Sequence, residues 1–282
     1  MRKFKCYWLL NSVQSTIKDE HICGYHVCDS SQIVNERSSL GADGRRFFDV
    51  LQQSTGLYNH SLWVFRDDEF QSQEEANSFS DIFRVVAESY YNFGASSSGL
   101  IIVDSNSNEI ITIQPPQVEA YQSIKLDTVN EDDLTRIFKL SEKLRSINRE
   151  KTNCFFSILD YLRDIRASPS FVGELALWSF VEHYWAQNRS GNTDIYKSLK
   201  SLLEEVYIDK QDRKDFNLLV RSVGHDLGKS YNEHILRNIL AHGKHMTLKE
   251  NWTENNWNNF NKVHEQLLSI VLIGIEKRIY AA

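Results

Sequence analysis

The sequence contains little cysteine, proline and glycine: 4 Cys, 3 Pro and 12 Gly among 282 residues. So few cysteines exclude a disulfide scaffold at this length. The scarcity of proline and glycine argues against a sandwich or barrel built on many tight turns. The longest apolar run, LLSIVLIGI at 267–275, is far shorter than the roughly 20 residues that a membrane-spanning helix needs. The opening MRKFKCYWLLNSVQS has no apolar core of signal-peptide length. We therefore expect a cytoplasmic protein with reduced thiols that does not associate with a membrane.

The chain also lacks an excess of positive charge, since 32 Lys and Arg stand against 38 Asp and Glu and the formal net charge is −6. This excludes a polycation that binds nucleic acid over its whole surface. The charge is unevenly spread. Residues 1–150 hold 15 Lys and Arg against 22 Asp and Glu, whereas residues 151–282 hold 17 against 16. The second part also has six of the nine histidines. Any contact with a polyanion is therefore expected there, as a local patch.

The adjacent Pro115 and Pro116 separate two kinds of sequence pattern, β-type runs before them and helical spacing after them. Paired prolines disfavour helix. Before them lie short β-type runs and one helical stretch. The run SGLIIVDSNSNEIITI predicts a hairpin with its turn at SNSN. Residues 1–120 are therefore predicted to form a mixed α/β domain. The β-type runs and the helical stretch are FKCYWLL, HICGYHVC, SLWVF, SGLIIVDSNSNEIITI and EEANSFSDIFRVVAESYYNF.

After the prolines the apolar residues recur at helical spacing almost throughout. Helices of ordinary length joined by short polar loops are typical of an up-down bundle. The sequence thus predicts an α+β protein in which an all-α bundle, residues 125–282, follows the mixed domain. The expected helices lie in NEDDLTRIFKLSEKLRSI, around 155–162, in SFVGELALWSFVEHYW, DIYKSLKSLLEEVY and RKDFNLLVRSV, and from about Glu254 to Tyr280.

The stretch YNEHILRNILAHGK, residues 231–244, predicts a helix with an unusual polar face. At 100° per residue its positions 234, 237, 238, 241, 242 and 245 share one side. The aliphatic Ile235, Leu236, Ile239 and Leu240 would face the core. A C-terminal cap at position 243 would place the histidine at 242 in the last turn, where the helix dipole favours an imidazolium. The polar face consists of His234, Arg237, Asn238, Ala241, His242 and His245.

An arginine, a histidine and an amide on one helix face suit metal-independent cleavage of RNA. An imidazole can accept the proton of the ribose 2′-OH or protonate the 5′-oxygen leaving group. A guanidinium can stabilise the charge that develops on the phosphate oxygens. One histidine serves one end of the proton transfer well, so a second copy from a two-fold partner would serve the other.

The segment Arg237–His242 resembles the R-x4–6-H motif of HEPN domains, in the variant where a polar residue follows the Arg and Gly follows the His. The motif lies late in the predicted bundle, before one more long helix. The LALWSFVEHYW helix and the α/β region ahead of the bundle make the chain similar to the ApeA-like HEPN proteins, a bacterial group associated with phage defence. The resemblance covers roughly residues 125–282.

The resemblance implies a metal-independent endoribonuclease, a toxin or phage-defence effector, that works as a homodimer. Arg237 and His242 would be the catalytic pair and Asn238 the supporting polar residue. Possible supporting roles fall to His234, His245 and Glu182, the last as an acid that orients the catalytic His or Arg. RNA would be the substrate, with tRNA as one candidate, and no cofactor or metal is expected. The N-terminal domain would bind a trigger or an inhibitor.

Two other interpretations stay open. A non-catalytic HEPN-like bundle that dimerises and binds a nucleotide or RNA fits the acidic overall balance. A plain protein-interaction scaffold would tolerate Arg237→Ala with no change in any nucleic-acid phenotype. A zinc site in HICGYHVC is not favoured. On a single strand, His21 and Cys23 would point to one face while His26 and Cys28 would point to the other, and their spacings miss the usual C-x2–4-C pattern.

Overall fold

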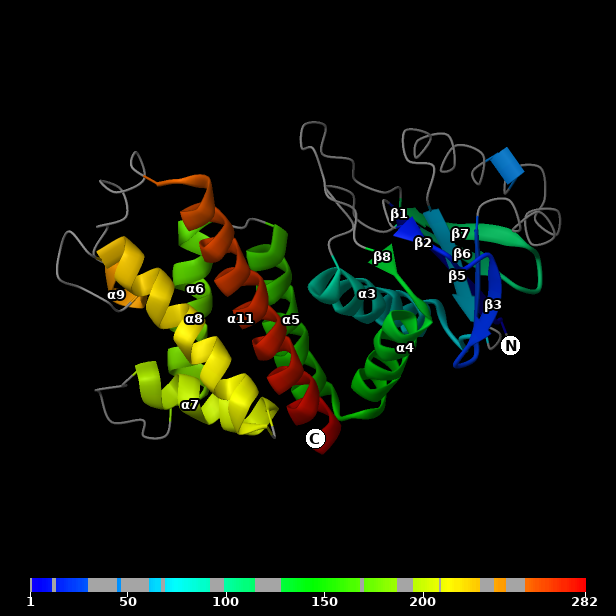
Figure 1. Cartoon of the computed structure of the whole chain (residues 1–282). Helices are drawn as coiled ribbons and strands as arrows, with labels where there is room; N and C mark the ends of the chain where they lie inside the picture. Colours follow the sequence, from blue (N-terminus) through cyan, green and yellow to red (C-terminus); the bar gives the residue numbers. More distant parts are fainter. Residues whose placement is uncertain are drawn as a thin grey trace. The chain divides into compact units, whose positions relative to one another are not determined.

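The chain folds into two compact units, Met1–Asp160 with Ala282, and Tyr161–Ala281 (Figure 1). An antiparallel sheet with helices comes first and mostly helices follow, so the α+β class is confirmed. The boundary between the two units lies within one helix, after Asp160. It does not lie near residues 120–125, where the sequence pattern changes from β-type runs to helical spacing. The computed structural model describes residues 2–11, 14–29, 45–46, 61–66, 69–91, 99–114, 128–167, 170–186, 195–207, 209–228, 236–241 and 252–282.

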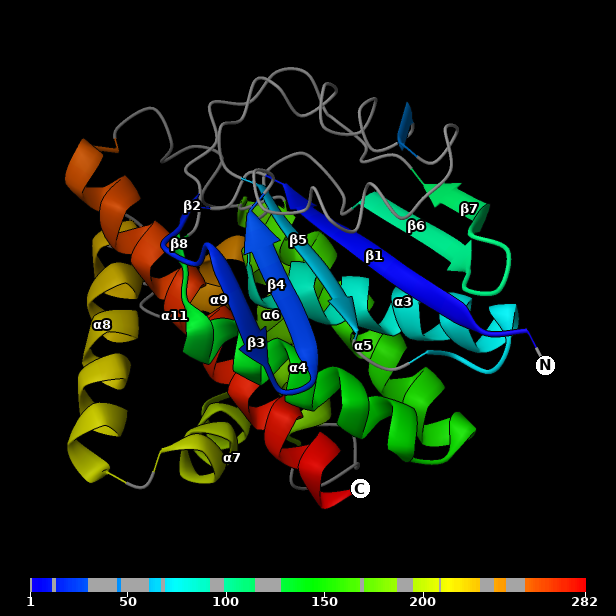
Figure 2. The same cartoon turned by 90° about the vertical axis from the view of Figure 1, so that its right-hand side faces the viewer.

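The first unit is built on a six-stranded sheet of order β3-β4-β5-β1-β6-β7, which Figure 2 shows nearly face-on. Every neighbouring pair in this sheet is antiparallel. A separate two-stranded parallel pair joins β2 to β8. The strands are β1 Phe4–Asn11, β2 Gln14–Ser15, β3 Asp19–Ile22, β4 Tyr25–Asp29, β5 Ser61–Arg66, β6 Gly99–Asp104, β7 Glu109–Gln114 and β8 Thr128–Val129.

Two tight turns form the β3–β4 and β6–β7 hairpins of this sheet. The predicted hairpin at SNSN is confirmed, and Asn108 takes the left-handed φ of 56° that closes its turn. The β-type run HICGYHVC is confirmed as β structure, but it is not a single strand. Cys23 (φ 51°) and Gly24 (φ 80°) turn the chain back on itself, so β3 and β4 form a hairpin.

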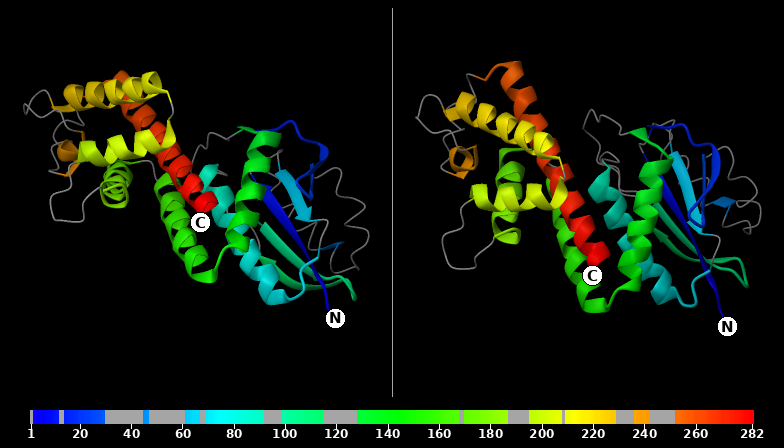
Figure 3. Two further views of the ribbon diagram at one scale, coloured as in Figure 1. Left: turned by 90° about the horizontal axis from the view of Figure 1, so that it is seen from below. Right: turned by 60° about the horizontal axis from the view of Figure 1, so that its bottom comes forward.

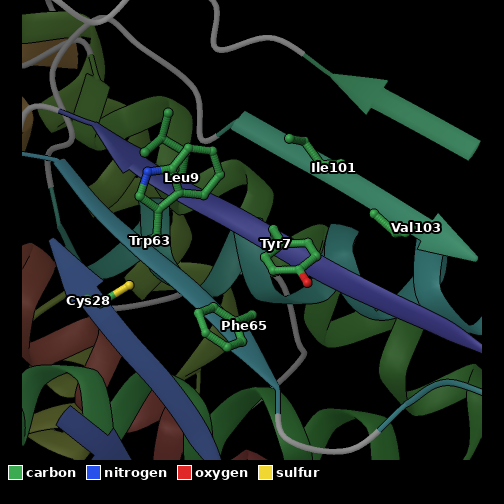
Figure 4. Close-up of a cluster of buried hydrophobic side chains, with 7 residues drawn as sticks. All are labelled: Tyr7, Leu9, Cys28, Trp63, Phe65, Ile101 and Val103. Atoms are coloured by element: carbon green, nitrogen blue, oxygen red, sulfur yellow. The ribbon is translucent and has the colours of Figure 1, made fainter. Parts of the chain in front are cut away.

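Apolar side chains cover both faces of the sheet. On one face the buried Trp8 of β1 packs on Phe79 and Phe83 of α3 (Gln73–Tyr90). Helix α4 (Glu131–Ser146) packs on α3, and its Asn130 forms a capping box with Asp133. The opposite face carries a second buried cluster, which Figure 4 shows. It comprises Tyr7, Leu9, Cys28, Trp63, Phe65, Ile101 and Val103.

Among the described residues of the second unit, all regular secondary structure is helical. Helix α5 (Arg149–Ala167) contains the division between the units. The others are α6 Phe171–Tyr184, α7 Ile195–Val206, α8 Lys210–Gly228, α9 Leu236–Ala241 and α11 Glu254–Ala281. Figure 3 shows these helices from two further directions. Among the described residues, no helix has the length and apolarity that a membrane crossing requires.

Helices α6 and α11 run in the same direction and pack closely. Glu174 near the start of α6 meets His264 of α11, and Trp185 just after the end of α6 meets Gly274 further along α11. A Cβ atom added at Gly274 would lie 2.8 Å from Cζ2 of Trp185, closer than any normal contact. The glycine therefore permits the close approach of the two helices.

Candidate active site

Helix α9 is the described part of the predicted 231–244 helix. Leu236, Ile239 and Leu240 are buried, as predicted for its aliphatic side, and the helix packs against α6 and α8. Arg237 and Asn238 are partly buried on the predicted polar side, and Ala241 is exposed. The three histidines proposed for this site, His234, His242 and His245, lie outside the described residues.

Arg237 is held by an acid from another helix. Its Nη2 donates a hydrogen bond of 2.9 Å to Oε2 of Glu182 on α6, and Nη1 donates a longer one of 3.4 Å to Oδ1 of Asn238. The Arg237 side chain is 30% exposed and that of Glu182 is 17% exposed. The pair is thus partly shielded from water but still reachable from the surface.

This arrangement gives the guanidinium a fixed position without exhausting its donors. Arginine carries five N–H groups, and two of its three nitrogens are engaged here. Nε of Arg237 is buried and has no hydrogen-bond partner among the described residues. An anion that approached the exposed part of Arg237 would meet a cation whose orientation is already set by Glu182, so less side-chain freedom would be lost on binding.

The structure therefore brings together three of the proposed site residues, Arg237, Asn238 and Glu182. The sequence suggested that an acid on the LWSFVEHYW helix could orient the catalytic His or Arg, and the described contact is with the Arg. Chemically the set can bind an oxyanion, because it offers a preoriented guanidinium beside an amide.

A second polar cluster lies deeper in the same unit and was not proposed from the sequence. Oε2 of Glu174 and Nδ1 of His264 are 2.6 Å apart, and Oε1 of the same carboxylate accepts a 2.7 Å hydrogen bond from Nε1 of Trp178. Glu174 is fully buried, His264 is 3% exposed, and Nε2 of His264 has no partner among the described residues. A histidine on the apolar side of the last helix, four residues after Phe260, was the available signal.

Buried in this way, Glu174 and His264 cannot meet a macromolecular substrate. They join α6 to α11 through a polar contact between buried side chains. A buried polar group without a hydrogen-bond partner would destabilise the fold there. The cluster therefore supports the helix that carries Glu182 and does not itself form a surface site.

The region around HICGYHVC gives no metal cluster. Contrary to the single-strand expectation, His21 and His26 face each other across the hairpin and stack with ring centroids 4.4 Å apart. His26 pairs with Asp19, Cys23 is exposed in the turn and Cys28 is buried. Within the part of the chain that the structure describes, no three His, Cys, Asp or Glu residues are placed to hold a metal ion.

The chain was compared with models of protein families, with curated proteins and with solved structures, and none of them matches it.

Proposed function

We propose that the protein is a metal-independent endoribonuclease of the HEPN type that acts as a toxin or phage-defence effector. Its active site would combine Arg237, Asn238 and His242 with the same residues of a second copy in a homodimer. The observation that carries the proposal is the fixed guanidinium of Arg237, on the helix of the R-x4-H motif, held by Glu182 from α6.

The reaction that these residues support is an internal transesterification. The ribose 2′-oxygen attacks the adjacent phosphorus while an imidazole accepts the 2′-OH proton. The bond from phosphorus to the 5′-oxygen breaks, and that oxygen takes a proton from the second imidazole. The products are a 2′,3′-cyclic phosphate and a 5′-hydroxyl. His242 of the two copies would supply the two imidazoles, and Arg237 would stabilise the charge on the phosphate oxygens.

The test is cleavage of total tRNA and of a generic single-stranded RNA in the presence of EDTA, followed by analysis of the fragment ends. We expect the wild type to leave 2′,3′-cyclic phosphates and both His242→Ala and Arg237→Ala to be inactive. Two matched controls are His183→Ala and Arg221→Ala, which remove exposed residues of α6 and α8 and should cleave as the wild type does. Full activity of either site variant would refute the assignment.

A second candidate function is a non-catalytic module that binds a nucleotide or RNA. The net charge of −6 favours it, because an acidic protein attracts long RNA weakly and is poorly suited to efficient cleavage of long RNA. This module would bind RNA in a way that depends on Arg237, while the RNA stays intact in every lane.

A further inference from the structure

A hollow on the first unit gathers four cations from separate parts of the fold. It has a volume of about 480 Å³, and none of its lining residues is apolar. Basic side chains come from β1 and the residues before it, from the end of β5 and from the end of α4. The lining residues are Lys3, Lys5, Arg66, Glu69, Gln71, Glu75 and Arg145. Lys3 forms an ion pair with Glu69 and Arg145 forms one with Glu75, so Lys5 and Arg66 give this lining its excess of positive charge, which favours an anion.

The two arginines of the hollow are held in place from behind. The guanidinium of Arg66 lies over the rings of Phe70 and Phe79, and that of Arg145 lies over the same two rings. Arg66 also pairs with Glu142, whose Oε2 lies 3.5 Å from Nη1 of Arg145. Stacking and ion pairing fix both guanidinium planes before any ligand arrives, which is the geometry suited to bidentate binding of phosphate.

A second hollow of about 450 Å³ adjoins the first and differs in character. The two share Glu75 and Arg145, which form an ion pair with each other. The wall of the second hollow contains both polar and apolar side chains. It comprises Ser72, Glu74, Glu75, Ser78, Phe79, Ile82, Arg145, Ile147, Arg149, Thr152 and Asn153. Such a mixed wall suits a planar ring that carries hydrogen-bonding groups.

From this juxtaposition we propose that the two hollows form one binding site for a mononucleotide. Its phosphates would lie against Lys3, Lys5 and Arg66. Its ring would lie in the second hollow, and Arg145 would contact the ligand between them. The proposal concerns the first unit alone and holds whether or not the second unit cleaves RNA. A phosphate chain and a base together match the contrasting linings of the two hollows, one charged and polar, the other partly apolar.

The experiment measures binding to the full chain by calorimetry, with ATP, pyrophosphate and adenosine as probes, each with and without Mg²⁺. We expect ATP to bind, pyrophosphate to bind more weakly and adenosine to bind weakest, because only ATP fills both hollows. Lys5→Gln should weaken ATP and pyrophosphate at least tenfold. Asn153→Ala, on the exposed wall of the second hollow, should weaken ATP and leave pyrophosphate unchanged.

Arg145→Gln should weaken ATP more than either of these variants, and its thermal unfolding shows whether loss of the Glu75 pair has disturbed the fold. If Arg145→Gln proves unstable, the ATP affinity of Lys5→Gln still tests the proposal. Lys139→Gln, an exposed position of the same helix as Arg145, should bind as the wild type does. No ATP binding by the wild type at millimolar concentration would overturn the proposal, as would ATP binding that Lys5→Gln and Arg145→Gln leave unchanged. A single-stranded RNA that binds through Lys5 and Arg145 without competition from ATP would also overturn it.

Discussion

Nη2 of Arg237 donates to Oε2 of Glu182 over 2.9 Å, and this bond joins residues 55 positions apart in the chain. It ties α9, the helix of the proposed catalytic motif, to the last turn of α6. A carboxylate in this place can orient the guanidinium towards a phosphate or compete with the phosphate for it. The partly buried setting favours orientation, because the arginine keeps further donors for a ligand.

The first prediction follows from this pair. Glu182→Ala should slow RNA cleavage on the order of tenfold to a hundredfold, because the guanidinium of Arg237 is then no longer held in the orientation that the reaction needs. Glu182→Gln retains an acceptor for Nη2 and should lose less. Single-turnover cleavage measures both, with His183→Ala, the exposed neighbour, as the control. Faster cleavage by Glu182→Ala would mean that the carboxylate restrains Arg237 instead.

The buried contact between α6 and α11 yields the second prediction. Glu174→Ala should destabilise the protein by about 3–5 kcal/mol, because it leaves the donors of His264 and Trp178 without an acceptor in the interior. Glu174→Gln should cost less, since a glutamine oxygen can accept from Trp178 while its amide donates to Nδ1 of the other histidine tautomer. Urea unfolding provides the comparison, with the exposed Glu265→Ala as the matched variant. Equal losses for Ala and Gln would argue against this role of the carboxylate.

Gly274→Ala tests the close packing of the same two helices. The new methyl group would lie 2.8 Å from Trp185 and 3.1 Å from Leu202. Trp185 cannot move freely because its Nε1 donates a 2.8 Å hydrogen bond to Glu205. Overpacking of this kind costs about 1–3 kcal/mol, against a helix-propensity gain of at most about 1 kcal/mol. We expect a lower thermal midpoint, whereas Ser269→Ala at an exposed position of α11 should change it little. An unchanged or raised midpoint for Gly274→Ala would show that Trp185 can move to accommodate the methyl group without loss of stability.

The ion pair of Glu205 with Arg278 makes stability depend on pH. Burial opposes ionisation of Glu205, but hydrogen bonds from Arg278 and Trp185 outweigh it and hold the pKa of the carboxyl below its usual 4.5. A lowered folded-state pKa stabilises the fold above the unfolded pKa, and this contribution is lost as the pH falls through the folded value. Glu205→Gln should therefore cost about 1–3 kcal/mol at pH 7 and much less at pH 3. Glu265→Gln, at an exposed position of α11, is the matched control variant, and a loss for Glu205→Gln that is equal at both pH values would exclude the linkage.

The four thiols should divide into two classes. Burial raises the pKa of Cys6 to about 12, against smaller opposing effects of the Ser80 hydroxyl and the Arg66 charge. At pH 8 its reactive thiolate form is therefore negligible, and Cys28 is buried as well, whereas Cys23 and Cys154 are exposed. Iodoacetamide followed by mass spectrometry should label Cys23 and Cys154 in the native protein, and all four after denaturation. Labelling of native Cys6 as fast as Cys154 would contradict the buried position of β1.

Local patterns were sufficient to predict most elements. The alternating runs around SNSN and the acidic start of NEDDLTRIFKLSEKLRSI describe a hairpin and a helix that the structure contains. The turn at Cys23 and Gly24 was missed because Cys23 must adopt a positive φ, which a non-glycine residue rarely does. No dipeptide signal of the usual kind marks that turn.

The sequence by itself determined that the chain is α+β, that helices dominate after the paired prolines, and that Arg237 and Asn238 share the polar side of a helix with a buried aliphatic side. These properties depend on neighbours a few residues apart, so periodicity reveals them. Only the tertiary structure decided that the helix at 131–146 belongs to the unit of the sheet, that Glu182 is the partner of Arg237, and that Glu174 meets His264. Such contacts join residues that are distant along the chain, and they form only when separate apolar faces pack together.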